Sequence, residues 1–304
     1  MSVRIDDEPL LSDASGAAAD AAKSLLNTGG LTLADVAAVA RASVTDGMFL
    51  GTLLGFVLMV LYTLADAHKA WEAEHQLSVN VCMAVLCWLF LPAVAPFIRS
   101  PCGARAAGSR LQAAGWALGL VADYSLLAGT VAFACLGVLL FLAGRGPAYL
   151  VALLLVECAG CWGFLLSACA YAASWVLGLP PEPHAVKGGA GAAAAAPAAP
   201  AGAGEAAAAR ARALAVTQLE WWGHALNIGG SLVYVLASTS STLLVVAGGQ
   251  GAPTSDAQAD LRQAMAQSFV VGDVLWTCDA AVFLGIWARE ALRAQRAKGA
   301  AGAL

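Results

Sequence analysis

The sequence predicts an all-α polytopic membrane protein with six transmembrane helices. Of its 304 residues, 60% are hydrophobic and only 12% are charged. Its mean hydropathy of +0.74 lies outside the range of ordinary soluble domains. The run 148–179 contains a single ionisable carboxylate, Glu157. About 20 apolar residues span the hydrocarbon core, and lipid accepts a helix that is apolar on every face. We therefore interpret this run as a membrane span.

The N-terminal tail, residues 1–46, is polar and rich in alanine. Its apolar spacing predicts a short helix over 32–44, with a disordered tail as the alternative. The first 16 residues are acidic and contain no apolar segment, so no cleaved signal peptide is predicted. Within them, DDEPLL resembles the acidic dileucine sorting signal, with Asp6, Leu10 and Leu11 as its recognised residues. That resemblance implies clathrin adaptors as partners and an endosomal or vacuolar membrane.

Five further apolar runs accompany the one above, and they cover 47–65, 78–98, 114–143, 224–247 and 268–288. Residues 180–210 are too rich in Pro, Gly and Ala to form a packed core, so they are predicted to be a flexible linker. The linker separates a four-helix region, 47–179, from an interfacial lead-in and two-helix hairpin, 211–290. A tail, 291–304, ends the chain. Six spans place both termini on one side of the membrane.

The distribution of basic residues predicts which side that is. Among the 16 Lys and Arg, only Lys69, Arg145 and Arg262 fall in the loops opposite the termini. Cytoplasmic loops carry the excess of Lys and Arg in membrane proteins. Both termini and the linker are therefore predicted to be cytoplasmic.

Carboxylates inside lipid are costly, so they are the first candidates for function. Asp123 and Glu157 lie near the ends of their runs, and we expect both to reach the lipid headgroups. Asp273 is close to the start of its run, whereas Asp279 lies near the middle. One interpretation of Asp279 is a proton or monovalent-cation site in a hydrated cavity lined by the helix over 224–247. That site would include Ser238, Asp273 and Glu157.

The alternative for Asp279 is a structural hydrogen bond across the last hairpin. Tyr234 and the hydroxyls of Ser238, Thr239 and Ser240 are the expected partners, because a short hairpin makes 224–247 a neighbour of 268–288.

Two other patterns suggest metal or thiol chemistry. In a helix, His68, Glu72 and His75 would share one face at i, i+4 and i+7, which suits a divalent metal, and a solvated loop is the alternative. Cys158 and Cys161 form a CxxC pair, for which we favour packing over redox or metal chemistry. Cys102 follows a span directly and is a candidate for palmitoylation. No disulfide framework is predicted from the eight cysteines.

The last two spans resemble the YrhK-type two-helix membrane domain over residues 224–290. Gly-Ser and Gly-polar steps open the two helices of that domain, and a basic residue closes the second. The corresponding residues in this chain are Gly230-Ser231, Gly272-Asp273 and Arg289. The resemblance implies a helical hairpin and lends no activity.

The predicted function is to move or sense a small solute or ion. A non-catalytic scaffold acting through its cytoplasmic tails is the first alternative, and a thiol-dependent membrane enzyme is the second. The sequence has no HExxH, GxSxG or P-loop motif, so no catalytic residue or cofactor is predicted. It also has no basic patch of the kind that nucleic-acid binders use. The expected partner is the lipid bilayer, and an oligomer is left open.

Overall fold

The computed structural model of the protein describes Ala37, Ala40, Ser43 and residues 46–71, 76–99, 110–142, 147–177, 218–247 and 256–301. These residues are almost entirely helical and include no strand. Six of the described helices are long and apolar enough to cross a membrane, which confirms the predicted class and number of spans. They are α3 (Gly47–Trp71), α4 (Gln76–Val94), α5 (Arg110–Leu142), α6 (Pro147–Val176), α8 (Leu219–Ala247) and α9 (Asp256–Ala301). A short 3-10 helix, η2 (Ala95–Phe97), follows α4.

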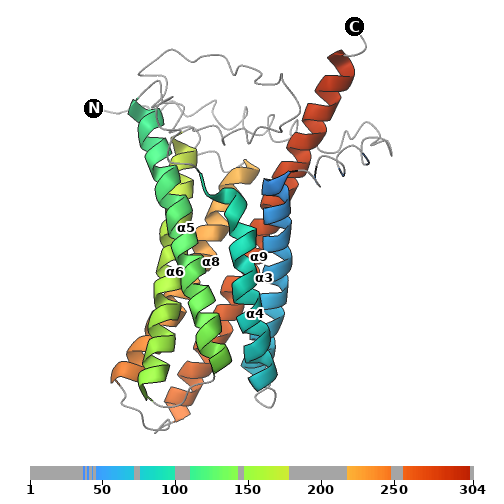
Figure 1. Ribbon diagram of the computed structural model, residues 1–304. Helices are drawn as coiled ribbons and strands as arrows, with labels where there is room; N and C mark the ends of the chain where they lie inside the picture. The colour runs from blue at the N-terminus through green and yellow to red at the C-terminus, as the bar shows by residue number, and fades with distance from the viewer. Residues whose placement is uncertain are drawn as a thin grey trace, which may run out of the picture.

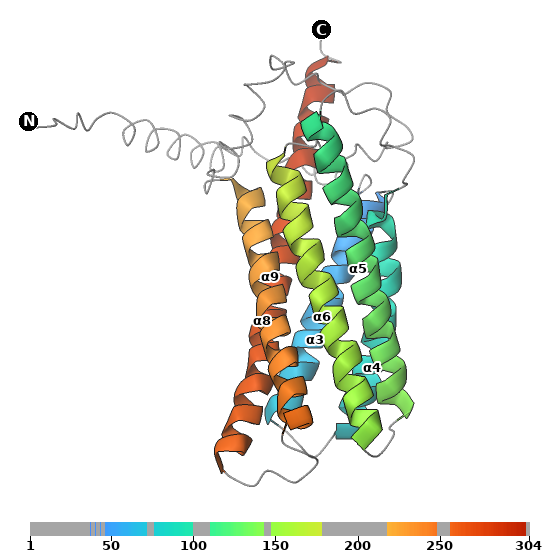
Figure 2. The ribbon, with the colours of Figure 1, turned by 90° about the vertical axis from the view of Figure 1, so that its left-hand side faces the viewer.

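The six helices form a closed ring (Figures 1 and 2). Each helix packs against the next one along the chain, and α9 returns to pack against α3. Because neighbouring helices run in opposite directions, α3 begins and α9 ends at the same end of the ring, which we call the terminal end (Figure 1). The other end, where α3, α5 and α8 each lead into the next helix, we call the hairpin end.

The inside of the ring is filled by one hydrophobic core to which all six helices contribute. A layer of five aromatic side chains crosses this core, with successive ring centroids between 4.5 and 6.5 Å apart. In order of contact, the rings are Tyr62, Phe133, Phe164, Trp276 and Tyr234. They come from α3, α5, α6, α9 and α8, so the layer occupies the centre of the ring.

Small and capping residues set the local geometry. Asp46 caps α3, because its Oδ1 accepts hydrogen bonds from the backbone N–H groups of Met48 and Phe49 at 2.9 and 3.2 Å. Its Oδ2 accepts a 3.0 Å hydrogen bond from the Trp287 indole of α9. On the other side of the ring, a Cβ added to Gly163 of α6 would lie 3.0 Å from Cα of Gly129 on α5. Small residues of this kind let membrane helices approach closely.

The helices extend beyond their apolar runs at three places. α3 continues from the predicted end at 65 to Trp71, so Asp66 lies in a helix and not in a loop. α8 begins at Leu219, inside the predicted lead-in. α9 runs for 46 residues and stays helical through most of the predicted tail (Figure 1). Arg, Glu and Gln favour helix without being apolar, so hydropathy marks the lipid-facing part of a helix and not its ends.

Of the predicted helix over 32–44, the structure describes Ala37, Ala40 and Ser43, all three helical. The linker 180–210 lies outside the described residues.

Candidate functional site: acidic groups inside the ring

Two carboxylates meet where the first span packs against the last. Asp66 of α3 has 8% of its surface exposed and Asp273 of α9 has none. Asp66 is close enough to Asp273 for a hydrogen bond between their side chains. The Tyr234 hydroxyl of α8 donates a hydrogen bond to Oδ1 of Asp273. Oδ2 of Asp273 has no hydrogen-bond partner among the described residues. We call Asp66, Tyr234 and Asp273 the central acidic site.

The packing of α3 against α9 independently places the two carboxylates together. Oγ1 of Thr63 lies 3.4 Å from Oγ1 of Thr277. Asp66 lies three residues beyond Thr63 toward the hairpin end, and Asp273 lies four residues from Thr277 in the same direction. Because antiparallel helices advance at about 1.5 Å per residue, these steps bring both carboxylates to similar depth.

Tyr234 is held in place by aromatic neighbours. Its ring stacks on Trp276 with a centroid separation of 4.5 Å and an interplanar angle of 12°. Phe269 meets the same ring edge-on at 5.1 Å. The Trp276 indole is fixed in turn, since its Nε1 donates hydrogen bonds to Oγ of Ser231 and the backbone carbonyl of Asn227 at 3.1 and 3.3 Å. The hydroxyl that reaches Asp273 therefore comes from a well-packed side chain.

Two glycines provide the space for these rings. A Cβ added to Gly230 would lie 2.7 Å from Cδ1 of Trp276, and one added to Gly272 would collide with the ring of Tyr234. Both positions belong to the Gly-polar steps that resemble the YrhK-type domain. In this chain they bring α8 and α9 together beside Asp273.

The central acidic site has a clear electrostatic consequence. Two unit charges about 4 Å apart repel by about 4 kcal/mol at an effective dielectric constant of about 20. Burial adds the cost of desolvating each carboxylate. The two carboxyls are therefore stable together when they hold a proton or when a cation lies between them. In either case the site would hold a small positive ion.

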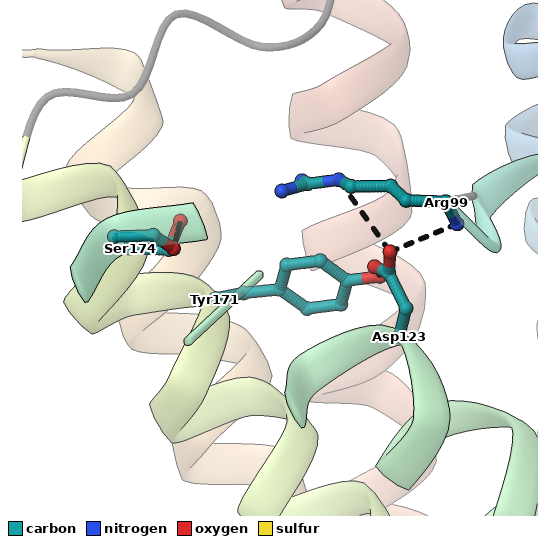
Figure 3. A network of polar contacts seen from close by, with 5 residues as sticks. Arg99, Asp123, Tyr171 and Ser174 are labelled. Atoms are coloured by element: carbon teal, nitrogen blue, oxygen red, sulfur yellow. Dashed lines mark hydrogen bonds and ion pairs between the residues drawn. The ribbon is translucent and has the colours of Figure 1, made fainter. Parts of the chain in front are cut away.

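A third acid, Asp123, has its own counter-ion at the terminal end of the ring (Figure 3). Its Oδ2 lies 3.4 Å from Nε of Arg99 and accepts a 3.0 Å hydrogen bond from the backbone N–H of Arg99. The Tyr171 hydroxyl donates a 2.6 Å hydrogen bond to Oδ1. Asp123 has no exposed surface. Its side chain is therefore enclosed by the protein and does not extend outward as expected, and Arg99, two residues beyond η2, supplies the opposite charge.

Asp279 of α9 does not make the hydrogen bonds to side chains of α8 that the sequence predicts for it. Its exposed fraction is 8%, and Oδ1 has no hydrogen-bond partner in the described part of the chain. Tyr234 bonds Asp273 instead. Gly223 faces Phe283 across the hairpin, so Asp279, four residues earlier, lies level with about Asn227. Ser238 is eleven residues further along α8, about 16 Å away.

Glu157 and Ser238 occupy other positions in the ring. Glu157 is half-buried on α6, one helical turn from Cys161. Ser238 is fully buried, and its Oγ donates a 3.3 Å hydrogen bond to the carbonyl of Val235. Sγ of Cys158 lies 3.6 Å from Oγ1 of Thr239, and both CxxC cysteines are free thiols. The structure therefore places these residues along the α6–α8 contact and not around Asp279.

The remaining predicted site residues are largely outside the described residues. Glu72 and His75 follow the end of α3 and are not described, so the metal site with His68 stays a prediction. The described residues contain no group of three His, Cys, Asp or Glu side chains placed to hold a metal ion. Asp6, Leu10, Leu11 and Cys102 lie outside the described residues, so sorting and palmitoylation also stay predictions.

Asp66 is the functional candidate that sequence reasoning missed. It was assigned to a loop because the apolar run stops at 65. One signal was available: the segment ADAHKAW contains no Gly or Pro, which allows the helix to continue. In that continued helix Asp66 follows Tyr62 by four residues and shares its inward face.

Comparison with known proteins adds no family to this description. No family model, curated protein or solved structure matches the chain. The resemblance of 224–290 to the YrhK-type domain therefore stays a prediction.

Proposed function

We propose that this multi-pass membrane protein moves or senses a proton or a small monovalent cation, which binds at the central acidic site. The observation that supports the proposal best is the burial of Asp273 beside a second carboxyl, Asp66, inside a membrane-spanning bundle. Ionisable residues at such positions mark ion pathways and proton relays in membrane proteins.

Comparison with Asp123 strengthens the argument for a bound positive ion. At both Asp123 and Asp273, a tyrosine hydroxyl from the neighbouring helix donates to Oδ1. At Asp123 the chain supplies the positive charge, through Arg99. At Asp273 the neighbouring charged group is another carboxyl. The same Asp–Tyr arrangement is thus neutralised internally in one place and suited to an external cation in the other.

The position of the site suggests how binding is passed to the rest of the protein. α3 and α9 are the only neighbouring pair in the described ring that are not consecutive along the chain. Repulsion between Asp66 and Asp273 would act across this contact, and a bound proton or cation would relieve it. Binding would then favour the closed α3–α9 contact, which gives either a moving or a sensing protein a two-state element.

The test measures ion binding directly. Purified protein is reconstituted in vesicles on a solid-supported electrode, and the buffer is stepped in pH or in Na⁺ or K⁺ concentration. We expect the wild-type protein to give a transient charge displacement, Asp273→Asn to lose it, and Asp66→Asn to reduce it strongly. Glu290→Gln is the matched control, because Glu290 is an exposed carboxylate on the same helix.

Equal currents in Asp273→Asn and in wild-type protein would remove the central acidic site from the function. A non-catalytic scaffold would then take precedence. One observation favours that alternative: α9 continues to Ala301 and extends beyond the ring at the terminal end (Figures 1 and 2). The thiol-dependent enzyme receives less support, because Cys161 has no exposed surface.

A further inference from the structure

The strongest feature outside the central acidic site is the lone carboxyl of Asp279. It lies in α9 six residues beyond Asp273, about 9 Å closer to the terminal end. Trp276 is midway between them along the helix and belongs to the aromatic layer that crosses the ring. The two acids are therefore on opposite sides of that layer.

The surroundings of Asp279 are apolar. On α3, Thr63 faces Thr277 and Phe49 faces Trp287. This register places Asp279 level with residues 57–61 of α3, a stretch that includes Leu58, which is 1% exposed and belongs to the hydrophobic core. An ionised, unpaired carboxylate in such a place is unfavourable even on the most permissive scale of membrane insertion. Asp279 must therefore be neutral or have a ligand.

The number of oxygen ligands that a site offers distinguishes a proton site from a metal-cation site. A cation of the Na⁺ or K⁺ type replaces its hydration shell with several oxygens, as the carbonyl rings of channels do. Oδ1 of Asp279 has no hydrogen-bond partner in the described part of the chain, and no described cluster of metal-binding side chains includes Asp279. A proton needs only one carboxyl oxygen.

We infer that Asp279 is a second binding site, specific for a proton, and that Trp276 separates it from the central acidic site. The inference rests on the geometry of Asp279 and extends the proposed function by a second step. A proton released by Asp273 would pass the Trp276 layer, bind Asp279 and leave toward the terminal end. The two carboxyls exchange only the proton, so no bond between heavy atoms forms or breaks.

Infrared spectroscopy of the reconstituted full-length protein tests the site without an assay of transport. A protonated carboxyl in apolar surroundings has a C=O stretching band that an ionised carboxylate lacks. We expect the difference spectrum between wild type and Asp279→Asn to show loss of such a band at neutral pH. Asp123→Asn is the matched control, because Asp123 lies 3.4 Å from Nε of Arg99 in an ion pair, and we expect its spectrum to lose no such band.

Two outcomes would overturn the inference. One is an Asp279→Asn spectrum that retains the full intensity of the protonated-carboxyl band. The other is disappearance of the band when Na⁺ or K⁺ replaces choline at constant pH, which would show a metal cation at Asp279. Asp279→Asn should also keep a midpoint of thermal unfolding close to that of wild type, because Asn is a neutral isostere of the protonated acid.

Charge-displacement measurements separate this inference from the proposed function. Asp279→Asn should keep the transient current of binding at the central acidic site but lose sustained proton flux at least tenfold. Loss of the transient current in Asp273→Asn with unchanged sustained flux in Asp279→Asn would retain the proposed function and reject the second site. A lost infrared band in Asp279→Asn, with no current in any variant, would retain the proton site and reject the proposed function.

Discussion

Buried carboxylates in this ring differ in what lies beside them, and their neighbours decide what each can do. Asp123 has Arg99 and Tyr171, so it stabilises the contacts among α4, α5 and α6. Asp273 has Asp66 and Tyr234, which suits a bound positive ion. Oδ1 of Asp279 has no hydrogen-bond partner among the residues that the structure describes. Residue type alone does not separate these three roles.

A glycine beside Arg99 gives a prediction at this scale. A Cβ added to Gly119 of α5 would collide with Nη1 of Arg99, whose guanidinium also lies over the Trp116 ring. Gly119→Ala should therefore displace Arg99 from its position beside Asp123. Because the displaced atoms are the flexible end of a side chain, we expect the free energy of unfolding in detergent to fall by about 1 kcal/mol, the lower end of the range for overpacked positions. Thermal unfolding followed by circular dichroism measures this.

Gly55→Ala is the matched control for that substitution. A Cβ at Gly55 of α3 would meet nothing within 4 Å. Alanine favours a helix over glycine by about 0.5–1 kcal/mol, so Gly55→Ala should be neutral or slightly stabilising. Similar behaviour of Gly119→Ala and Gly55→Ala would show that Arg99 does not occupy the position described.

The site was partly predictable from the sequence at the residue scale. Depth within an apolar run identified Asp279, because the free-energy cost of an ionised carboxylate depends on its distance from water. Asp273 was included in the predicted site although it lies near the start of its run. The partners were not predictable, since they depend on helix register. A shift of about two turns along α8 decides whether Tyr234 meets Asp273 or Asp279. Arg99 was counted as a loop residue, and only the structure shows it turning inward.

At the scale of helices, hydropathy predicts where the lipid is and not where the helix ends. α3 and α9 both continue through polar residues, and the continuation of α3 places Asp66 in the ring. Contacts between helices consecutive along the chain follow from the short connections between most of them. The packing of α3 against α9 does not follow from a short connection, because 184 residues separate Trp71 from Asp256. Nothing in the apolar pattern pairs these two helices.

Cross-linking tests the contact between α3 and α9. In a background with all eight native cysteines replaced, Thr63→Cys with Thr277→Cys should form a disulfide under mild oxidation, because the two Oγ1 atoms are 3.4 Å apart. Mass spectrometry of the digested protein detects the linked peptides. Val57→Cys with Val274→Cys is the control, since both side chains are exposed on the outside of the ring. Linkage in the control pair alone would contradict the ring.

For the whole molecule, the class and the number of spans follow from composition and from six apolar runs. The closure of the six spans into a ring around an aromatic layer could not be predicted from the composition or from the apolar runs. Open and closed arrangements of six apolar helices have the same hydropathy pattern. Closure depends on side-chain fit, as between the Trp287 indole of α9 and Asp46 at the start of α3.

The orientation of the ring in the membrane is the remaining prediction. Lys69, Arg145 and Arg262 are the only basic residues expected at the hairpin end, so the terminal end should face the cytoplasm. Glycosylation acceptors carried on spacers should therefore be modified when inserted at 72–75 or 248–255 and unmodified when inserted at 185–205. Gel mobility before and after deglycosylation measures the modification. A modified acceptor at 185–205 would reverse the orientation, and a proton passing from Asp273 to Asp279 would then move out of the cytoplasm instead of into it.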